Sequence, residues 1–350
     1  MKYYLKDSFL SNEYEKNAGN KARNDVEAIL VSEGYKGLEL KVENWYKMNF
    51  FKAQQHKYRA LKSVFDQLGA GDELVIQFPI IHHTFFISQL IKQAQNRGVK
   101  FYLVIHDIET LRHVGNSAVK LRHKVRNYFQ EKAALISVDG IIVHNDIMKN
   151  ALTIQGIPSD KMVSLEIFDY LIPNFEEKSV PQKEEAIIIA GNLIPTKSGY
   201  LYNLPEQPAY NLYGMGYDES RALKNTTYFG SFMPDDLPNA LQGSFGLVWD
   251  GDSSETCQGS FGNYLRINNS HKASLYLASG FPLVVWKESA LAHFVLDKQC
   301  GIAIDSLHDL QKALDDLTDQ DYMELSANAR QVGAAIRSGE YLKSAISKLK

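Results

Sequence analysis

Residues 246–282 read GLVWDGDSSETCQGSFGNYLRINNSHKASLYLASGFP, and the order of patterns in this segment predicts the fold class. An apolar run at 245–249 stops at an acidic, Gly-rich stretch, and a second apolar run begins at Pro282. Between them an amphipathic segment starts after Ser270, a favourable helix N-cap, and ends at Gly280, a favourable residue just beyond a helix. Strand, polar loop, helix and strand in this order indicate a parallel α/β sheet.

The start of this predicted helix is also a predicted anion site. The first backbone N–H groups of a helix have no partner inside it, and the helix dipole favours negative charge there. Two basic residues, His271 and Lys272, occupy this first turn, where their charge opposes the dipole. A phosphate bound close by would explain them, and an ordinary solvated lysine is the alternative.

Composition limits the class of protein. The chain has 350 residues, enough for two ordinary domains, and is 45% hydrophobic with a net charge of −3, which argues against nucleic-acid binding. Two cysteines without metal-ligand spacing fit a reducing, cytoplasmic setting and no structural zinc. The first residues lack the apolar core of a signal peptide, and no run reaches the ~20 apolar residues that span a bilayer, so we expect at most peripheral membrane contact.

Strand and helix patterns alternate through both halves of the chain. Apolar runs at 74–78, 99–105 and 140–144 are each followed by helical spacing. A charged segment at 173–185 that contains prolines is typical of an interdomain linker. After it the alternation restarts with an apolar run at 186–190.

We therefore predict an α/β fold of two Rossmann-like, doubly wound domains that face each other across a cleft. The first domain is expected at 1–175 and the second at 176–336, and the last helix, about 337–350, could pack back on the first. Missing motifs disfavour three enzyme classes, because the chain has no GxGxxG after its first strand, no GxxxxGK[ST] and no GxSxG. A nicotinamide cofactor, a P-loop and an α/β-hydrolase nucleophile are therefore not expected.

A charged cluster, HDIETLR at 106–112, follows the predicted strand at 99–105. Ligands of open α/β sheets bind beyond the carboxyl ends of the strands, so this cluster is well placed for chemistry. Asp107 is our candidate general base, with Glu109 and His106 as competitors. Alternatively, Asp107 only caps the next helix, which would explain one carboxylate but not the whole cluster.

A cleft between two such domains commonly takes a nucleotide-linked donor on one side and an acceptor on the other. Glycosyl transfer from a nucleoside diphosphate needs positive charge at the leaving diphosphate and, for inversion, a base on the opposite side. Lys197 and Lys272 can meet the first need. Asp250 and Asp252 form a DxD pattern, which we interpret as a loop that contacts sugar hydroxyls rather than a metal, so no metal cofactor is expected.

Five stretches share the order found in one family, and they read NAGNKAR (17–23), VIHDIETLR (104–112), AGNLIPTKSGYL (190–201), FGLVWDGD (245–252) and FGNYLRINNSHKASLYLASGFPLV (261–284). Together they resemble the GT-B galactofuranosyltransferases of bacterial polysaccharide clusters. These are related to the glucosyltransferases that extend GlcNAc on streptococcal serine-rich adhesins. The wording WDGD and NNSHK is closer to the galactofuranosyl group.

The resemblance implies a UDP-sugar donor, metal-independent inverting transfer and a donor site mostly in the second domain. Donor contacts are expected at Gly19, Asn20, Lys21, Gly191, Asn192, Lys197, Phe232, Asn268, His271 and Lys272. Sugar or acceptor contacts are expected at Arg112, Asp250, Asp252 and Tyr264. Homo-oligomers occur among these relatives, so a homo-oligomer is expected here.

We therefore predict transfer of a galactofuranosyl residue from UDP-galactofuranose to a glycan or lipid-linked oligosaccharide in cell-surface polysaccharide synthesis. Two alternatives stay open: a UDP-glucose-dependent glucosyltransferase acting on a GlcNAc-modified protein or glycan, and a non-catalytic nucleotide-sugar-binding subunit. An epimerase of nucleotide sugars is less favoured. A basic-faced helix at 118–136 is either a solvated surface or a contact with anionic lipid at the inner face of the membrane.

Overall fold

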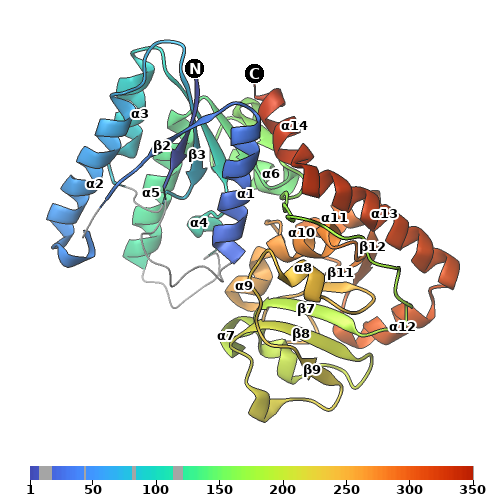
Figure 1. Cartoon of the computed structure of the whole chain (residues 1–350). Coiled ribbons are helices and arrows are strands. Elements are labelled where there is room, and N and C mark those ends of the chain that lie inside the picture. Colours follow the sequence, from blue (N-terminus) through green and yellow to red (C-terminus); the bar gives the residue numbers. More distant parts are fainter. Residues whose placement is uncertain (8–17, 43–44, 81–83, 113–120, 350) are drawn as a thin grey trace.

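The computed structural model describes residues 1–7, 18–42, 45–80, 84–112 and 121–349. Two six-stranded sheets organise these residues, and every strand pair in both sheets is parallel (Figure 1). The predicted α/β fold of two doubly wound domains is therefore confirmed. Among the described residues, no helix is both long and apolar enough to cross a membrane.

The first sheet has the strand order β2-β1-β3-β4-β5-β6. Its strands are β1 (Lys2–Lys6), β2 (Lys36–Glu39), β3 (Glu73–Phe78), β4 (Lys100–Ile105), β5 (Gly140–Val143) and β6 (Met162–Ser164). The helices that accompany it are α1 (Ala18–Ser32), α2 (Phe50–Phe65), α3 (Ile87–Gln95), α4 (Glu109–Arg112), α5 (Leu121–Ser137) and α6 (Asp146–Ile154).

The second sheet has the order β12-β11-β10-β7-β8-β9. Its strands are β7 (Ile187–Asn192), β8 (Tyr210–Met215), β9 (Thr226–Tyr228), β10 (Gly246–Val248), β11 (Leu283–Trp286) and β12 (Gly301–Ile304). The helices that follow the linker are α7 (Pro195–Ser198), α8 (Leu237–Ala240), α9 (Gly259–Tyr264), α10 (His271–Ala278), α11 (Ala290–Asp297), α12 (Leu310–Asp315), α13 (Asp319–Ser338) and α14 (Glu340–Lys348).

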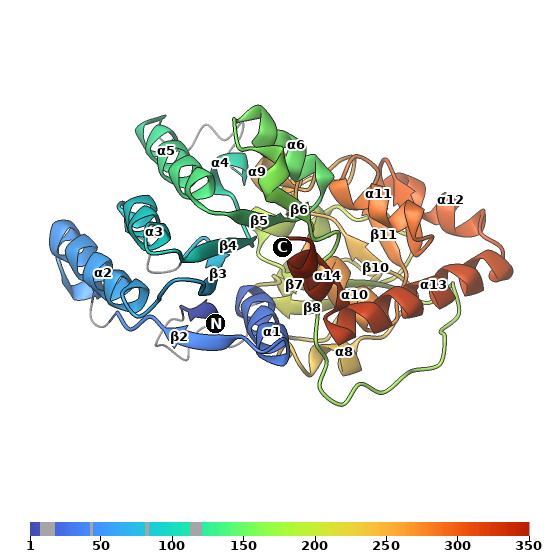
Figure 2. The ribbon, with the colours of Figure 1, turned by 90° about the horizontal axis from the view of Figure 1, so that it is seen from above.

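The central strands of the first sheet are buried on both faces, as their apolar runs indicate. Side chains alternate along each strand, so Ile76 and Leu103 join the core beneath α2 and α3, whereas Val75 and Val104 join a second core on the other face. Figure 2 shows α2, α3 and α5 on one side of this sheet and α1 and α14 on the other. Helices on both faces leave the strand ends as the open part of the domain.

The C-terminal helix α14 packs on the first domain. Gly339, with φ of 75°, ends α13 in the left-handed conformation, and the chain then turns toward α1. Leu342, Ala345 and Ile346 share a buried core with residues of α1 and of the first sheet. The N–H groups of Leu342 and of its neighbour donate to the Asp169 carboxylate at the start of α14.

Asp169→Asn should become more stable relative to the wild type as pH rises from about 4 to 7. Burial raises the pKa of Asp169 to about 7, although the N–H groups of α14 lower it. The folded chain thus holds the proton more tightly than the unfolded chain, whose carboxyl titrates near 4, and this stability is lost as pH rises through 7. Urea unfolding at several pH values should show a relative gain on the order of 1 kcal/mol per pH unit. A difference that stays constant with pH would contradict this assignment.

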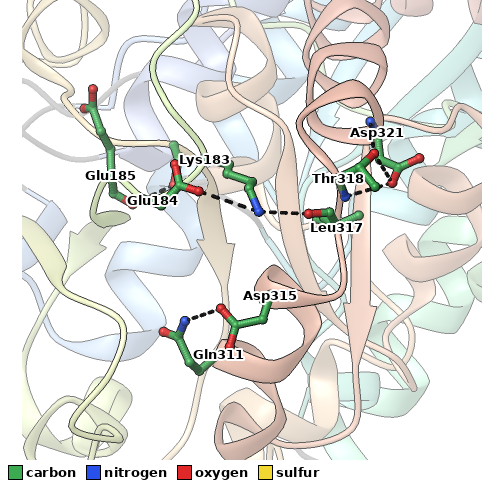
Figure 3. Close-up of polar contacts among 9 residues, drawn as sticks. Lys183, Glu184, Glu185, Gln311, Asp315, Leu317, Thr318 and Asp321 are labelled. Carbon is green, nitrogen blue, oxygen red and sulfur yellow. Dashed lines mark hydrogen bonds and ion pairs between the residues drawn. The ribbon is translucent and has the colours of Figure 1, made fainter.

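The linker lies along the second domain. Lys178 donates to the backbone oxygens of Pro238, Asn239 and Leu241 in and after α8. Lys183 donates to Leu317 O, 2.8 Å away, between α12 and α13 (Figure 3). These bonds hold 178–183 against the second domain.

Some elements differ from the expectations. The edge strands β2 and β9 were not among the apolar runs that predicted strands. The Gly-rich stretch after Trp249 contains the helix α9, because tertiary contacts of its last residue, Tyr264, outweigh the low helix propensity of glycine. The predicted basic helix is α5, but the side chains of residues 120–126 lie outside the described residues.

Candidate active site

The helix α9 of the second domain packs against the edge of the first sheet that carries the charged cluster 106–112. The side chain of Tyr264, at the end of α9, is buried in the core of the first domain. Its hydroxyl oxygen accepts the N–H of Ile108 at 3.1 Å and donates to the carboxylate of Asp107. The carboxyl end of β4 is thereby joined to the segment that follows β10, and the predicted cluster lies where the two domains meet.

Asp107 is a partly exposed carboxylate at this junction. Its side chain is 39% exposed, and Arg112 Nη1 lies 3.5 Å from its Oδ2. Burial raises the pKa of Asp107, and Glu109 raises it further, whereas Arg112, Tyr264 and Lys197 lower it. A carboxylate whose pKa is raised but which stays accessible is suited to accept a proton.

Glu109, the first residue of α4, is a second accessible carboxylate two positions after Asp107. Its side chain is 38% exposed, and its Oε1 lies 3.9 Å from Arg112 Nη1. The N–H groups of Glu109 and Thr110 donate to the carboxylate of Glu131 in α5, at 2.9 and 3.0 Å. Glu131 thus orders the start of α4, a function that its distant position in the sequence did not indicate.

His106 lies deeper than its two neighbours. Its Nε2 is 2.7 Å from Gln77 Oε1, and its ring stacks on Phe168 with a centroid distance of 5.6 Å. Burial holds the pKa of His106 well below its ordinary value. The ring is therefore neutral and already paired, which favours Asp107 over His106 as the base.

Lys272 lies in the first turn of α10, as predicted, but its charge has a partner. Its Nζ donates to Asp250 Oδ1 at 2.8 Å and to Trp249 O at 2.9 Å. Only 11% of the Lys272 side chain and 9% of the Asp250 side chain are exposed. Gly191 packs against the stem of Lys272 with φ of +128°, a conformation that favours glycine. The Asp250 carboxylate thus holds Lys272, and its expected sugar contact stays a prediction.

Lys197, in α7, brings a second cation to the junction. Its Nζ lies 5.6 Å from the ring centroid of Phe261, and the guanidinium of Arg112 lies 5.1 Å from the same ring. Asp250 raises the pKa of Lys197, but burial and the positive charges of Lys272 and Arg112 outweigh it, and the net pKa is lowered. Cations of both domains thus converge near Phe261, which sequence reasoning did not single out.

The loops around these cations are held by local bonds. Asn192 Oδ1 accepts the N–H of Ile194, and Gly251 N donates to Lys197 O, so the two loops are tied together. Asp252 is exposed and accepts from Gln258 Nε2 at 3.2 Å. Within the described part of the chain, no group of three or more His, Cys, Asp or Glu side chains is placed to hold a metal ion.

Lys21 lies where the two domains meet. Its Nζ donates to Asp25 at 2.8 Å and to Leu171 O at 2.6 Å, and it lies 2.7 Å from Asp235 of the second domain. It also lies 4.9 Å from the ring centroid of Tyr170. An ammonium group has three N–H donors, and three acceptors surround this one. Lys21 thus links the two domains, and its expected donor contact stays a prediction.

Gly19 and Asn20 lie in the first turn of α1, not in a loop, because this helix starts at Ala18. Phe232 follows β9 and packs on Tyr213, with ring centroids 6.1 Å apart. The donor contacts expected of these three residues stay predictions.

His271 is neutral at the start of α10. Burial lowers the pKa of His271 to about 4, and its ring lies 5.1 Å from Tyr170 and 6.0 Å from Phe168. The expected positive charge at His271 is therefore wrong. Among the described residues, its buried Nε2 and the buried Oδ1 of Asn268 have no hydrogen-bond partner, and Ser270 makes no capping bond with its side chain. The start of α10 thus holds two buried polar atoms that no described residue satisfies.

Asn269 joins the two domains through its side chain. Its Nδ2 donates to His144 O and Glu166 O, both at 2.7 Å, and its Oδ1 accepts from Asn145 Nδ2 at 2.7 Å. Its backbone N–H donates to His144 Nδ1 at 3.0 Å. Asn145 also caps α6, where its side chain accepts the N–H of Met148. Its contact with Asn269 joins residues 124 positions apart, so no local sequence pattern indicates it.

Comparison with known protein families identifies the family of the chain. The model of the glucosyltransferase 3-like N-terminal domain matches residues 3–167, and that of the C-terminal domain matches residues 187–349. The chain belongs to the glucosyltransferase 3-like family. This family is the one predicted from the five stretches, and the two matched ranges contain the first and the second sheet.

Individual relatives agree with the family. The beta-1,6-galactofuranosyltransferase WbbI of Escherichia coli is 34% identical over 284 residues, 79% of each chain. Glucosyltransferase 3 of Streptococcus gordonii is 23% identical over 92% of this chain and 91% of its own. The structure of sucrose-phosphate synthase from Thermosynechococcus elongatus is similar with a TM-score of 0.66 at 12% identity, covering 99% of this chain and 97% of that chain. The chain is a glycosyltransferase with the GT-B fold.

Asn269→Ala should destabilise this glucosyltransferase 3-like chain by about 3 kcal/mol. The change would leave the Asn145 amide and two buried carbonyls without their partner at the domain junction. Urea unfolding measures the loss. Asn239→Ala, at an exposed asparagine in α8, is the control and should cost less than about 0.5 kcal/mol. Equal losses in both variants would show that the junction does not depend on Asn269.

Proposed function

We propose that this chain is an inverting glycosyltransferase that moves a galactofuranosyl residue from UDP-galactofuranose to a hydroxyl of a growing glycan in cell-surface polysaccharide synthesis. The observation that carries the proposal is the meeting of Asp107, a partly exposed carboxylate of the first domain, with Lys197 of the second. A base and a cation from opposite domains are what a displacement between acceptor and donor needs. The 34% identity to a galactofuranosyltransferase supports the choice of sugar.

In this mechanism the acceptor hydroxyl gives its proton to Asp107 while its oxygen bonds to the anomeric carbon of the donor. The bond from that carbon to the diphosphate breaks on the opposite face, and UDP leaves with the electron pair. Lys197 and Lys272 stabilise the negative charge that grows on the diphosphate. Burial, which raises the pKa of Asp107, makes it a stronger proton acceptor.

The diphosphate binds at the start of α10 in this proposal. The N-terminal backbone of a helix favours an anion, and Lys272 brings positive charge to the first turn of α10. Ser270 makes no capping bond with its side chain, so it leaves the first N–H groups of α10 without that partner. Lys197, Lys272 and Arg112 supply positive charge themselves, so transfer is proposed to proceed without a divalent metal.

A donor screen tests the proposal. Thermal unfolding of the purified chain is measured with UDP, GDP, UDP-glucose, UDP-galactose and UDP-galactofuranose, each with a chelator and with magnesium. A ligand at 100 times its Kd stabilises the folded state by about 2.7 kcal/mol, which a melting curve resolves easily. We expect UDP and UDP-galactofuranose to raise Tm equally with and without metal.

The outcomes separate the alternatives. Stabilisation by UDP-glucose in place of UDP-galactofuranose would identify a glucosyltransferase, which the Streptococcus gordonii relative favours. A chain that binds a UDP-sugar but neither transfers the sugar to glycan or lipid-linked acceptors nor hydrolyses the donor would be a binding subunit. If no uridine nucleotide changes Tm under either condition, the proposed donor site is wrong. Light scattering of the same samples tests the proposed homo-oligomer.

A further inference from the structure

A cluster of exposed aromatic side chains lies outside the candidate active site. Phe50 and Phe51, at the start of α2, are 54% and 83% exposed, and Phe86, just before α3, is 53% exposed. Phe50 lies 5.7 Å from Phe51 and 5.4 Å from Phe85, measured between ring centroids, and Tyr58 lies 6.0 Å from Phe86. We call these five residues the aromatic rim. Contiguous exposed apolar surface of this kind marks an interaction site.

The rim lies within a strongly basic segment. Residues 45–62 hold five Lys or Arg residues and no Asp or Glu, although the whole chain has a net charge of −3. Lys52 and Arg59 are exposed, whereas Lys57 is buried with its Nζ 3.8 Å from the ring centroid of Trp45. Exposed phenyl rings next to exposed cations are the pattern of a surface that contacts anionic lipid.

The neighbouring helix continues the same charge. The sequences of α2 and α3 contain four and one Lys or Arg residues and no Asp or Glu. Both helices lie on one side of the first sheet (Figure 2). Their exposed side chains include Lys52, Arg59 and Lys92, and we call this side of α2 and α3 the basic face.

The rim lies at the edge of the domain where Asp107 is found. The starts of α2 and α3 follow the carboxyl ends of β2 and β3, and Asp107 follows the carboxyl end of β4. Carboxyl ends of parallel strands meet at one edge of a sheet, so the rim and Asp107 share that edge. In Figure 1 the lower end of α2 and the short α4 both lie on the side of the first domain that is nearer to the second.

We propose that the aromatic rim and the basic face of α2 and α3 dock on an anionic lipid bilayer. Phe50, Phe51 and Phe86 enter the boundary between headgroups and acyl chains, and Lys52 and Arg59 contact the headgroups. A lipid-linked acceptor in that bilayer then reaches Asp107 along the edge shared with the rim. This last step rests on the proposed function, whereas binding to the bilayer does not.

A second copy of the chain fits this face less well. A symmetric dimer would bring the same basic surface of two chains together, and like charges at an interface repel. A free glycan would explain the aromatic rings but not the accumulation of cations around them. An anionic bilayer explains both features, because it accepts apolar rings and attracts Lys and Arg.

Vesicle sedimentation with the full chain tests the proposal. The vesicles contain phosphatidylcholine alone or with roughly one-third phosphatidylglycerol. We expect the wild type to bind the anionic vesicles at least about tenfold more tightly than the neutral ones, and Phe50→Ser/Phe51→Ser to lose at least about tenfold. The control, Ile154→Ser/Leu296→Ser, removes residues that are 87% and 55% exposed elsewhere and should bind like the wild type.

The readouts separate this inference from the proposed function. The Tm shift with UDP should be the same in the wild type and in Phe50→Ser/Phe51→Ser, which shows that the variant is folded and that its donor site is intact. Absence of vesicle binding by the wild type, or equal binding by both double variants, would overturn the docking surface. Loss of a dimer in Phe50→Ser/Phe51→Ser, seen by light scattering with vesicle binding unchanged, would assign the rim to a second copy and would also overturn it. Failure of UDP to shift Tm in the wild type would overturn the proposed function alone.

Discussion

Asp107→Asn is expected to reduce sugar transfer about 10³-fold while UDP affinity stays within about twofold of the wild type. The amide keeps the size of the side chain and can still accept from its neighbours, but it cannot take a proton from the acceptor. UDP binding depends on second-domain cations, so it should survive the change. Transfer is measured as UDP release with saturating donor and acceptor, and UDP affinity by calorimetry.

Glu109→Gln is the matched control for this experiment. Glu109 lies two positions away at the start of α4, is almost equally exposed and also neighbours Arg112, so its replacement removes a comparable charge. We expect it to reduce transfer by less than about tenfold. A larger loss in Glu109→Gln than in Asp107→Asn would make Glu109 the base. Because burial raises the pKa of Asp107, the acid limb of the wild-type rate profile should also lie above the ordinary range of a carboxylate.

The positions of the central site residues could be predicted because they follow from backbone topology. Asp107 follows a buried strand and Lys272 starts a helix after another, and strand ends of parallel sheets meet at one edge. Their partners could not be predicted in the same way. Asp250 lies 22 positions from Lys272, and Tyr264 reaches Asp107 only because α9 enters the core of the other domain.

Two features of the site residues were missed in the sequence for different reasons. Lys21 and Asp25 have the spacing of neighbours on one helix face, so their ion pair could have been noticed in the sequence, but the contact with Asp235 comes from the docking of the domains. The charge of His271 depends on burial against Phe168 and Tyr170, which no sequence pattern shows. The sequence therefore could not predict the charge or the ion-pair partners of residues that are buried only when the two domains pack together.

Lys272→Ala is expected to weaken UDP binding about 30- to 100-fold, because it removes a charge-assisted contact with the diphosphate. The same change should lower the free energy of unfolding by about 3 kcal/mol, because Asp250 would keep a buried carboxylate without its partner. Calorimetry with UDP and urea unfolding measure the two effects separately. A weakened affinity alone would therefore not prove a contact with the donor, since a damaged fold could also cause it.

The double variant Asp250→Asn/Lys272→Ala separates the two causes. It removes both charges of the buried pair, so most of the lost stability should return, whereas UDP binding should stay as weak as in Lys272→Ala. If the double variant binds UDP like the wild type, Lys272 acts only by neutralising Asp250, and the donor site must lie elsewhere. If stability and affinity both stay low, the Asp250→Asn change has not repaired the site. The single variant Asp250→Asn, which retains Lys272, then shows whether the lysine alone can hold the diphosphate. A free Lys272 in that variant should bind UDP at least as tightly as the wild type, because its charge is no longer shared with Asp250.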